Sequence, residues 1–361
     1  CKCTNIGEEY SCGRGLWSGL REDMSVLIDP DIDSLLEKTS RSFYPTLKYL
    51  PKKIRGQIGL LYLLARVADT IADSKEGETE SLIQALTEYN EVAQGRSTEL
   101  PDLTHLADIQ ANADEGELLR NVQKVVDALK IYNEGDQQRM LECLDVIVGG
   151  QILDLQRFGI AREGGNISAL QTEQELDDYT YRVAGCVGVF WTKMSLAHII
   201  SIPKDKEELF FENGIRFGKA LQMINILRDI PEDLRFGRCY IPEPSLAEHG
   251  LVPNQLLEPD NIDVFRPLYD SYLDLTSGHL DAAVEYIRML PDRQFRLKAA
   301  TMLPVLIGQR TVTLLREGNI LDSDEKIKIT RDEMKAYFKK LLRALILPGG
   351  VQRLLAKNKN A

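Results

Sequence analysis

The residues best suited to chemistry are two carboxylates four positions apart, Asp69 and Asp73, inside a strongly apolar stretch. This stretch, residues 58–74, reads IGLLYLLARVADTIADS, and a helix that is apolar on nearly every side is a buried one. Residues four apart share one helical face, so two like charges repel there. Because unpaired carboxylates are costly to bury, we expect a cation between them, and Mg²⁺ typically takes one or two carboxylates plus substrate phosphates.

A second acidic run makes a chance pairing less credible in a chain with 55 Asp and Glu. In LQMINILRDIPED, residues 221–233, Asn225, Asp229 and Asp233 are again spaced by four within an apolar run. Pro231 lacks a backbone donor, so we expect the helix to end or kink there, with Asp233 on the exit turn. The two runs predict facing helices whose carboxylates hold several Mg²⁺ ions, which in turn hold a diphosphate.

Helical periodicity dominates the chain, and no strand-like alternation of apolar and polar residues stands out. We expect 95–114 to be loop, and helices near 79–94, 115–131, 136–158, 173–200, 206–230, 262–289, 291–317 and 331–346. The length of 361 residues alone allows two domains, but nothing resembles a linker and the two acidic motifs must converge. The prediction is therefore one all-α domain. No apolar run reaches 18 residues, so no transmembrane helix is expected.

The net charge and the cysteine content indicate which binding partners and which cellular compartment to expect. The formal net charge of −11 argues against a nucleic-acid partner, but Mg²⁺ can still bridge acidic residues to an anionic substrate. Six cysteines form no disulfide framework, which fits a reduced, cytoplasmic compartment.

The two ends differ from the middle of the chain. Residues 1–23 are Gly-rich without an apolar core, and we expect a non-native or disordered extension before a domain at 24–346. The basic C-terminal tail is 347–361, and no acid occurs from Lys335 onward. A basic amphipathic end is a candidate for peripheral contact with anionic lipid at the inner face of the membrane. The alternative is a docked last helix with a frayed tail.

Four blocks together resemble the squalene and phytoene synthase family of head-to-head prenyltransferases. They are SRSF (40–43), ARVADTIAD (65–73), YTYRVAGCVG (179–188) and LQMINILRDIPEDLRFGRCYIP (221–242). Their order and spacing fit the family, and the resemblance spans about residues 30–320. It implies a single-domain, all-α isoprenoid synthase fold, a helical bundle around a central apolar cavity, and farnesyl diphosphate as substrate.

The resemblance also implies roles for individual residues. The implied Mg²⁺ ligands are Asp69, Asp73, Asn225, Asp229 and Asp233. The implied substrate-binding residues are Ser40, Ser42, Phe43, Arg66, Gln222, Asn225, Arg228, Arg238 and Tyr240. Tyr179 is implied to be catalytic beside the four aspartates, handling a proton or steering the carbocation. For Gln151 and Asp154 two roles remain possible: they are polar groups of the substrate pocket, or they cap a helix at the surface.

The blocks point to more than one branch of this family. The pair Asp69-Thr70 resembles squalene synthases, because the carotenoid branch usually has two adjacent aspartates there. The segments NILRDIPEDLRFGRCYIP and LAEHGL are more similar to phytoene and dehydrosqualene synthases. We expect the chain to be most like a bacterial squalene synthase, which joins two farnesyl diphosphates to presqualene diphosphate and converts this, with hydride from NADPH, to squalene. No Rossmann motif is visible, so NADPH would bind otherwise. The alternatives are a dehydrosqualene or phytoene synthase without NADPH, and a non-catalytic isoprenoid-binding protein.

Overall fold

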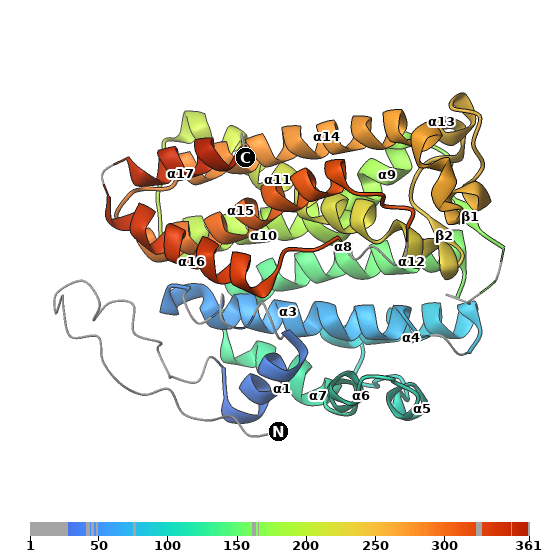
Figure 1. Cartoon of the computed structure of the whole chain (residues 1–361). Helices are drawn as coiled ribbons and strands as arrows, with labels where there is room; N and C mark the ends of the chain where they lie inside the picture. The colour runs from blue at the N-terminus through green and yellow to red at the C-terminus, as the bar shows by residue number, and fades with distance from the viewer. Residues whose placement is uncertain are drawn as a thin grey trace, which may run out of the picture.

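The computed structural model describes residues 28–40, 44, 47, 50–74, 77–160, 164, 166–322, 327–347 and 349–359. Within these residues the protein is almost entirely α-helical, as predicted. Figure 1 shows the long helices lying side by side in layers, with α1 and α5–α7 below α3 and α4.

The amino-terminal half contributes eight described helices, together with a 3₁₀ turn at Ala128–Ile131. The helices are α1 (Pro30–Ser40), α3 (Lys52–Ala72), α4 (Thr79–Ala93), α5 (Thr104–Asp108), α6 (Ala113–Arg120), α7 (Val122–Asp127), α8 (Glu134–Phe158) and α9 (Glu173–Thr180).

The carboxy-terminal half contributes another eight described helices, with 3₁₀ turns at Lys204–Lys206, Pro253–Leu257 and Pro259–Asn261. The helices are α10 (Cys186–His198), α11 (Glu207–Arg228), α12 (Ile230–Arg235), α13 (Glu243–Glu248), α14 (Ile262–Met289), α15 (Phe295–Glu317), α16 (Arg331–Ile346) and α17 (Gly350–Lys359).

Two apolar clusters hold the helices together. One lies among α1, α3, α4, α6, α7, α8 and α10, and the other among α11, α12, α14, α15 and α16. Helix α3 buries 15 of its 21 residues, ten of them as members of the first cluster, which confirms that the first acidic motif belongs to a buried helix. Helix α11 packs against both α10 and α14, and the buried apolar residues around the second motif belong to the second cluster.

Glycines set the distance between α10 and α11. A Cβ on Gly188 would lie 1.9 Å from the carbonyl oxygen of Gly214, and a Cβ on Gly218 would lie 2.1 Å from that of Ala184. Real atoms do not approach so closely, so only glycine permits this crossing. The small residues of the block VAGCVG thus bring α11, and the second acidic motif, close to the helix that follows Tyr179.

Two predicted helices are interrupted. The helix expected at 173–200 passes through a π-helical segment, Tyr181–Gly185, where the amide of Cys186 bonds to the carbonyl of Tyr181 five residues back. The helix expected at 206–230 ends at Arg228, because a new helix begins at Ile230 with Pro231 in its first turn. Asp233 therefore lies on α12, and its predicted place on an exit turn was wrong.

Other boundaries also depart from the sequence prediction. The helix expected at 115–131 is split into α6, α7 and a 3₁₀ turn, and α5 lies inside the predicted loop 95–114. The strands β1 (Ser168–Ala169) and β2 (Arg238–Cys239) pair in parallel, although no strand was predicted. Strands of two residues are too short to produce an alternating pattern. Among the helices that the structure describes, none combines the length and apolarity needed to cross a membrane.

Candidate active site

The first acidic motif lies on the last turn of α3 and at its C-cap. Asp69 is on the helix, and Asp73 caps it, donating its amide to the carbonyl of Asp69 at 2.8 Å. The apolar residues around them hold this end of α3 inside the protein, while the Asp69 side chain stays 34% exposed and that of Asp73 67%. Both carboxylates can thus be reached from the same open side of a buried helix.

Asp69 has a close neutral partner and a more distant cation. The Gln151 amide on α8 donates to Asp69 Oδ1 at 2.5 Å. Arg66 pairs mainly with Glu115, and its nearer nitrogen lies 4.0 Å from Asp69 Oδ2. The surrounding protein, and then the charge of Asp73, raise the pKa of Asp69 to about 7. The carboxylate is therefore short of positive charge.

The second motif is divided by the break between α11 and α12. Asp229 is the C-cap of α11 and the residue before α12. Arg228 binds it with two hydrogen bonds, from Nε to Oδ1 at 2.7 Å and from Nη2 to Oδ2 at 2.6 Å. Asp233 is half-buried on α12, where burial and the charge of Asp229 raise its pKa well above the ordinary value. Asn225 is exposed on α11, one turn before Asp229, and its Nδ2 lies 3.5 Å from Gln222 Oε1.

Arg238 on β2 joins the first motif to α8. Its Nη1 lies 3.6 Å from Asp73 Oδ1 and 3.4 Å from Asp154 Oδ2. Arg238 follows α12 by three residues, so the short parallel pairing of β2 with β1 fixes its place in the site. One guanidinium thus connects the loop after the second motif with both the first motif and α8.

Two tyrosines complete this side of the site. The Tyr240 hydroxyl donates to Asp154 Oδ2 at 2.9 Å, and its ring stacks on Tyr179 with centroids 4.6 Å apart. The ring of Phe158 packs edge-on against that of Tyr240, with centroids 5.2 Å apart. Burial raises the pKa of both tyrosines well above their usual range, so their hydroxyls remain protonated. Burial also raises the pKa of Asp154 to about 6.

The remaining predicted residues are placed differently. Ser40 is buried at the end of α1, where its hydroxyl donates to the carbonyl of Leu36 one turn earlier. Ser42 and Phe43 lie outside the described residues. The substrate-binding roles implied for these three residues stay predictions.

Gln151 and Asp154 are brought into the site, although sequence reasoning left their place open. Gln151 is 82 residues away from Asp69 in the sequence, and Asp154 is 86 residues away from Tyr240. Helical periodicity carries no information about contacts over such sequence separations. The signal was a pair of polar residues three apart on an otherwise apolar helix face. Glu115, the main partner of Arg66, was not predicted.

The donor atoms suit a hard divalent cation. The aspartates and Asn225 offer oxygen ligands only. Burial is the main cause that raises the pKa values of four acids here, Asp69, Asp73, Asp154 and Asp233, and a bound cation would stabilise their charged forms. Within the described part of the chain, no three His, Cys, Asp or Glu side chains are grouped closely enough to hold an ion by themselves. An ion here would need further oxygen ligands, such as those of a diphosphate.

Comparison with known proteins identifies the family. Residues 36–333 match the family model for squalene/phytoene synthase. The chain belongs to this family. The squalene/phytoene synthases are head-to-head prenyltransferases, and the chain is an enzyme of this class. The match covers both acidic motifs, Tyr179 and Arg238, so the resemblance in the sequence blocks is confirmed.

Similar members of the squalene/phytoene synthase family have different named activities. The 4,4'-diapophytoene synthase of Staphylococcus haemolyticus is 25% identical over 312 residues, 84% of this chain and 95% of that enzyme. The squalene synthase of Saccharomyces cerevisiae is 27% identical over 237 residues, 63% of this chain but only 48% of the yeast protein. The specific product therefore does not follow from these relatives.

A solved structure of TcSQS with a bound ligand supports the fold. It superposes with a TM-score of 0.72 at 19% identity, covering 91% of this chain and 90% of that one. At this identity the likeness concerns the fold alone. The predicted all-α isoprenoid synthase fold is confirmed.

Proposed function

We propose that the protein is a squalene synthase that joins two molecules of farnesyl diphosphate through presqualene diphosphate and completes the reaction with NADPH. The proposal rests on the position after Asp69. There the chain has Thr70, which is buried and donates its hydroxyl to the carbonyl of Arg66 at 2.8 Å. The first motif thus offers no second adjacent carboxylate, and adjacent aspartates are the pattern that the family resemblance associates with the carotenoid branch.

The oxygen ligands for Mg²⁺ in this proposal are those of Asp69, Asp73, Asn225, Asp229 and Asp233. Bound Mg²⁺ would neutralise the charge that develops on the leaving diphosphate. Among the cations of this chain, Arg238 lies between the first motif and the loop after the second. In this proposal its guanidinium would donate to a diphosphate held between the two motifs.

The other residues would guide the hydrocarbon part of the reaction. An allylic cation reacts with water unless the site excludes it, and buried apolar side chains of α3 and α8 flank the acidic motifs. Tyr179 and Tyr240 form a stacked pair with protonated hydroxyls beside Asp154. A protonated tyrosine hydroxyl can accept a proton only if it passes its own proton on to a neighbouring group. The pair is therefore suited to relaying a proton that the carbocation loses.

The alternative is a dehydrosqualene or phytoene synthase, which would need no NADPH. It is favoured by the similarity to 4,4'-diapophytoene synthase over 95% of that enzyme's length. A non-catalytic isoprenoid-binding protein is less well supported, because both acidic motifs are intact.

Product analysis separates these functions. The purified protein is incubated with farnesyl diphosphate and Mg²⁺, with and without NADPH, and the organic extract is analysed by mass spectrometry. The proposal expects squalene only when NADPH is present. Dehydrosqualene in both reactions would overturn it in favour of the carotenoid branch, and turnover of geranylgeranyl diphosphate alone would indicate a phytoene synthase.

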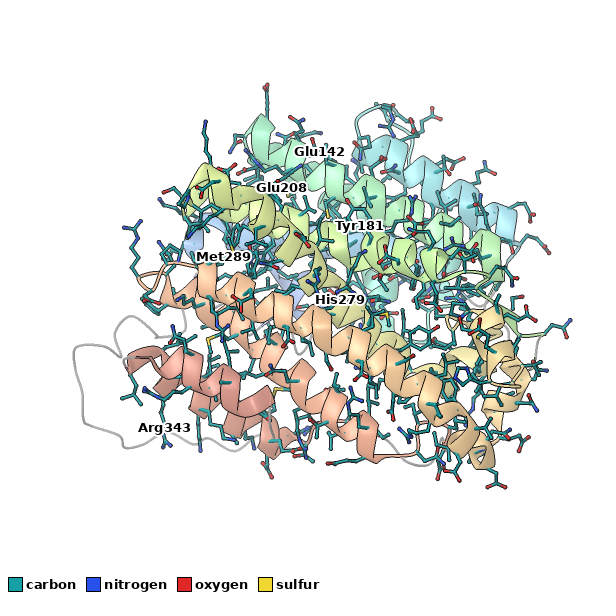
Figure 2. All side chains as sticks on the ribbon, turned by 90° about the horizontal axis from the view of Figure 1, so that it is seen from above. Glu142, Tyr181, Glu208, His279, Met289 and Arg343 are labelled. Atoms are coloured by element: carbon teal, nitrogen blue, oxygen red, sulfur yellow. The ribbon has the colours of Figure 1, made fainter. Side chains whose placement is uncertain are left out.

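We further propose that the basic C-terminal helices contact anionic lipid. Residues 334–361 carry seven Lys or Arg and no acid, whereas the rest of the chain has 37 basic against 55 acidic residues. On α16 the exposed residues include Lys335, Lys339, Lys340 and Arg343. Figure 2 shows Arg343 at the outer edge of the molecule. Leu347, 56% exposed, follows this basic face directly.

Vesicle flotation tests the lipid contact. We expect the full chain to float with vesicles rich in phosphatidylglycerol and not with phosphatidylcholine, less so at high salt. The variant K339E/K340E/R343E should lose flotation. The control K130E/K204E/K206E changes the net charge equally on other exposed sites and should keep it. Equal loss in both variants would contradict a contact made by α16.

A further inference from the structure

Asp154 is a buried carboxylate with too few partners. Its side chain is 4% exposed, and Oδ2 accepts from Tyr240 at 2.9 Å and lies 3.4 Å from Arg238. Its other oxygen, Oδ1, is buried without a hydrogen-bond partner among the described residues. A buried carboxylate depends on its partners, and among the described residues Asp154 forms its ion pair with Arg238.

That cation is shared with the first acidic motif. The same nitrogen, Arg238 Nη1, lies 3.4 Å from Asp154 Oδ2 and 3.6 Å from Asp73 Oδ1. The two acids differ in burial, since the Asp73 side chain is 67% exposed and that of Asp154 is 4% exposed. Solvent screens the pairing with Asp73 more strongly than the pairing with Asp154. Asp154 and Asp73 therefore compete for one guanidinium.

We propose that Asp154 is a positioning residue that holds Arg238 back from Asp73 and so leaves Asp73 available to Mg²⁺ and diphosphate. This inference rests on the proposed function, because it assumes that the first motif binds Mg²⁺ with diphosphate. Without the charge of Asp154, Arg238 has Asp73 as its remaining acidic contact at this distance. Their ion pair then tightens, and Mg²⁺ must displace a stronger competitor from Asp73.

The substitution Asp154→Asn separates the charge from the hydrogen bond. An asparagine oxygen at the position of Oδ2 can still accept from the Tyr240 hydroxyl, so the stack of Tyr240 on Tyr179 has reason to persist. Only the negative charge facing Arg238 is lost. Changes in ion binding then report the competition for Arg238 and not a displaced tyrosine.

A purely electrostatic role for Asp154 predicts the opposite result. If Asp154 only added negative charge, its removal would make the site more positive and would strengthen the binding of diphosphate. The positioning role predicts weaker Mg²⁺ binding, because Arg238 then blocks Asp73. The direction of the change therefore distinguishes the two explanations.

The experiment measures binding of inorganic diphosphate by calorimetry while Mg²⁺ is titrated, without any turnover. For Asp154→Asn we expect the Mg²⁺ concentration at half-saturation to rise about tenfold, the effect of one competing ion pair. For Arg238→Gln, at saturating diphosphate, the Mg²⁺ concentration at half-saturation should be equal to the wild-type value or lower. Adding Asp154→Asn to Arg238→Gln should cause no further change, because the competitor is absent.

Asp136 supplies a matched control on the same helix. It is fully buried at the start of α8 and bonds with Gln57, Asn133, Arg139 and His198, with none of the active-site residues. Asp136→Asn should lower the thermal midpoint and leave the Mg²⁺ requirement unchanged. A structural role alone for Asp154 would make the two variants behave alike.

The outcomes separate this inference from the function that it deepens. If wild-type protein binds diphosphate with Mg²⁺ but Asp154→Asn binds it equally or more tightly, the positioning role is overturned and the proposed function is not. If the wild type shows no Mg²⁺-dependent diphosphate binding, both are overturned. If Asp154→Asn does not fold, Arg238→Gln decides alone: a higher Mg²⁺ requirement in that variant overturns the positioning role.

Discussion

The two acidic motifs have the same spacing in the sequence and different surroundings in the structure. Asp69 belongs to an unbroken helix and has a neutral partner, Gln151. Asp229 stands at a helix break and is bound at both oxygens by Arg228. An ion approaching Asp69 replaces an amide, whereas an ion approaching Asp229 must displace a guanidinium. The side chain that an incoming cation would have to replace therefore differs between Asp69 and Asp229.

The largest expected effect comes from removing one carboxylate of either motif. Asp69→Asn and Asp229→Asn should each lower kcat/KM about 10³-fold or more, because each loses several kcal/mol of charge stabilisation in the transition state. Steady-state assays with farnesyl diphosphate measure this, and circular dichroism checks the fold. Near-normal turnover in Asp229→Asn alone would show that only the first motif binds metal.

A smaller effect is expected when the second motif is released from its cation. Arg228→Gln should lower kcat about tenfold, because a donor near the diphosphate is lost, and should also lower the Mg²⁺ concentration needed for half-maximal activity. Arg66→Gln is the comparison at the first motif. Its nitrogen is 4.0 Å from Asp69 and it pairs mainly with Glu115, so the Mg²⁺ requirement should hardly change. Equal Mg²⁺ requirements in the two variants would remove the distinction between the motifs.

The neutral partner of the first motif should matter less. Gln151→Ala removes the amide that bonds to Asp69 Oδ1, and we expect kcat/KM to fall about threefold to tenfold, the value of one hydrogen bond to a charged group. Gln138→Ala is a control on the same helix, since the exposed Gln138 donates to Glu142 at 2.9 Å and to neither acidic motif. A loss as large as that of Asp69→Asn would mean that Gln151 itself contacts the substrate.

The smallest effect concerns stability as the pH changes. The pKa of Asp69 is raised from 3.8 to about 7, so between these values the folded chain binds more protons than the unfolded chain. The free energy of unfolding must therefore fall as the pH rises through this window. Without Mg²⁺, the thermal midpoint of the wild type should drop between about pH 5 and pH 8, and Asp69→Asn should drop less. Identical slopes would contradict the raised pKa of Asp69.

The sequence predicted local features of the site better than its long-range contacts. Periodicity located α3, α8, α11 and α14 because their apolar faces repeat along the helix. Pro231 correctly indicated a break near Asp229. The π-helical turn before Cys186 could not be predicted, because it depends on how α10 packs against α11 at Gly188 and Gly218.

The features of the site that the sequence did not predict depend on contacts between segments that are far apart in the chain. The family resemblance indicated Arg238 and Tyr240 as site residues but gave no reason for them to contact Asp154, because that contact depends on how β2 pairs with β1. The partner of Asp69 on α8 was equally hidden, since spacing along one helix says nothing about its neighbours. Such contacts follow from the packed fold and not from any local pattern.

The most direct test of a single site built from both motifs is the binding of Mn²⁺ in the presence of inorganic diphosphate, followed by electron paramagnetic resonance. The wild-type protein should bind Mn²⁺ much more tightly when diphosphate is added. Asp69→Asn and Asp229→Asn should each lose that enhancement, because one diphosphate is held from both sides. If either variant keeps the full enhancement, the two motifs do not act on the same diphosphate, and they do not form a single site.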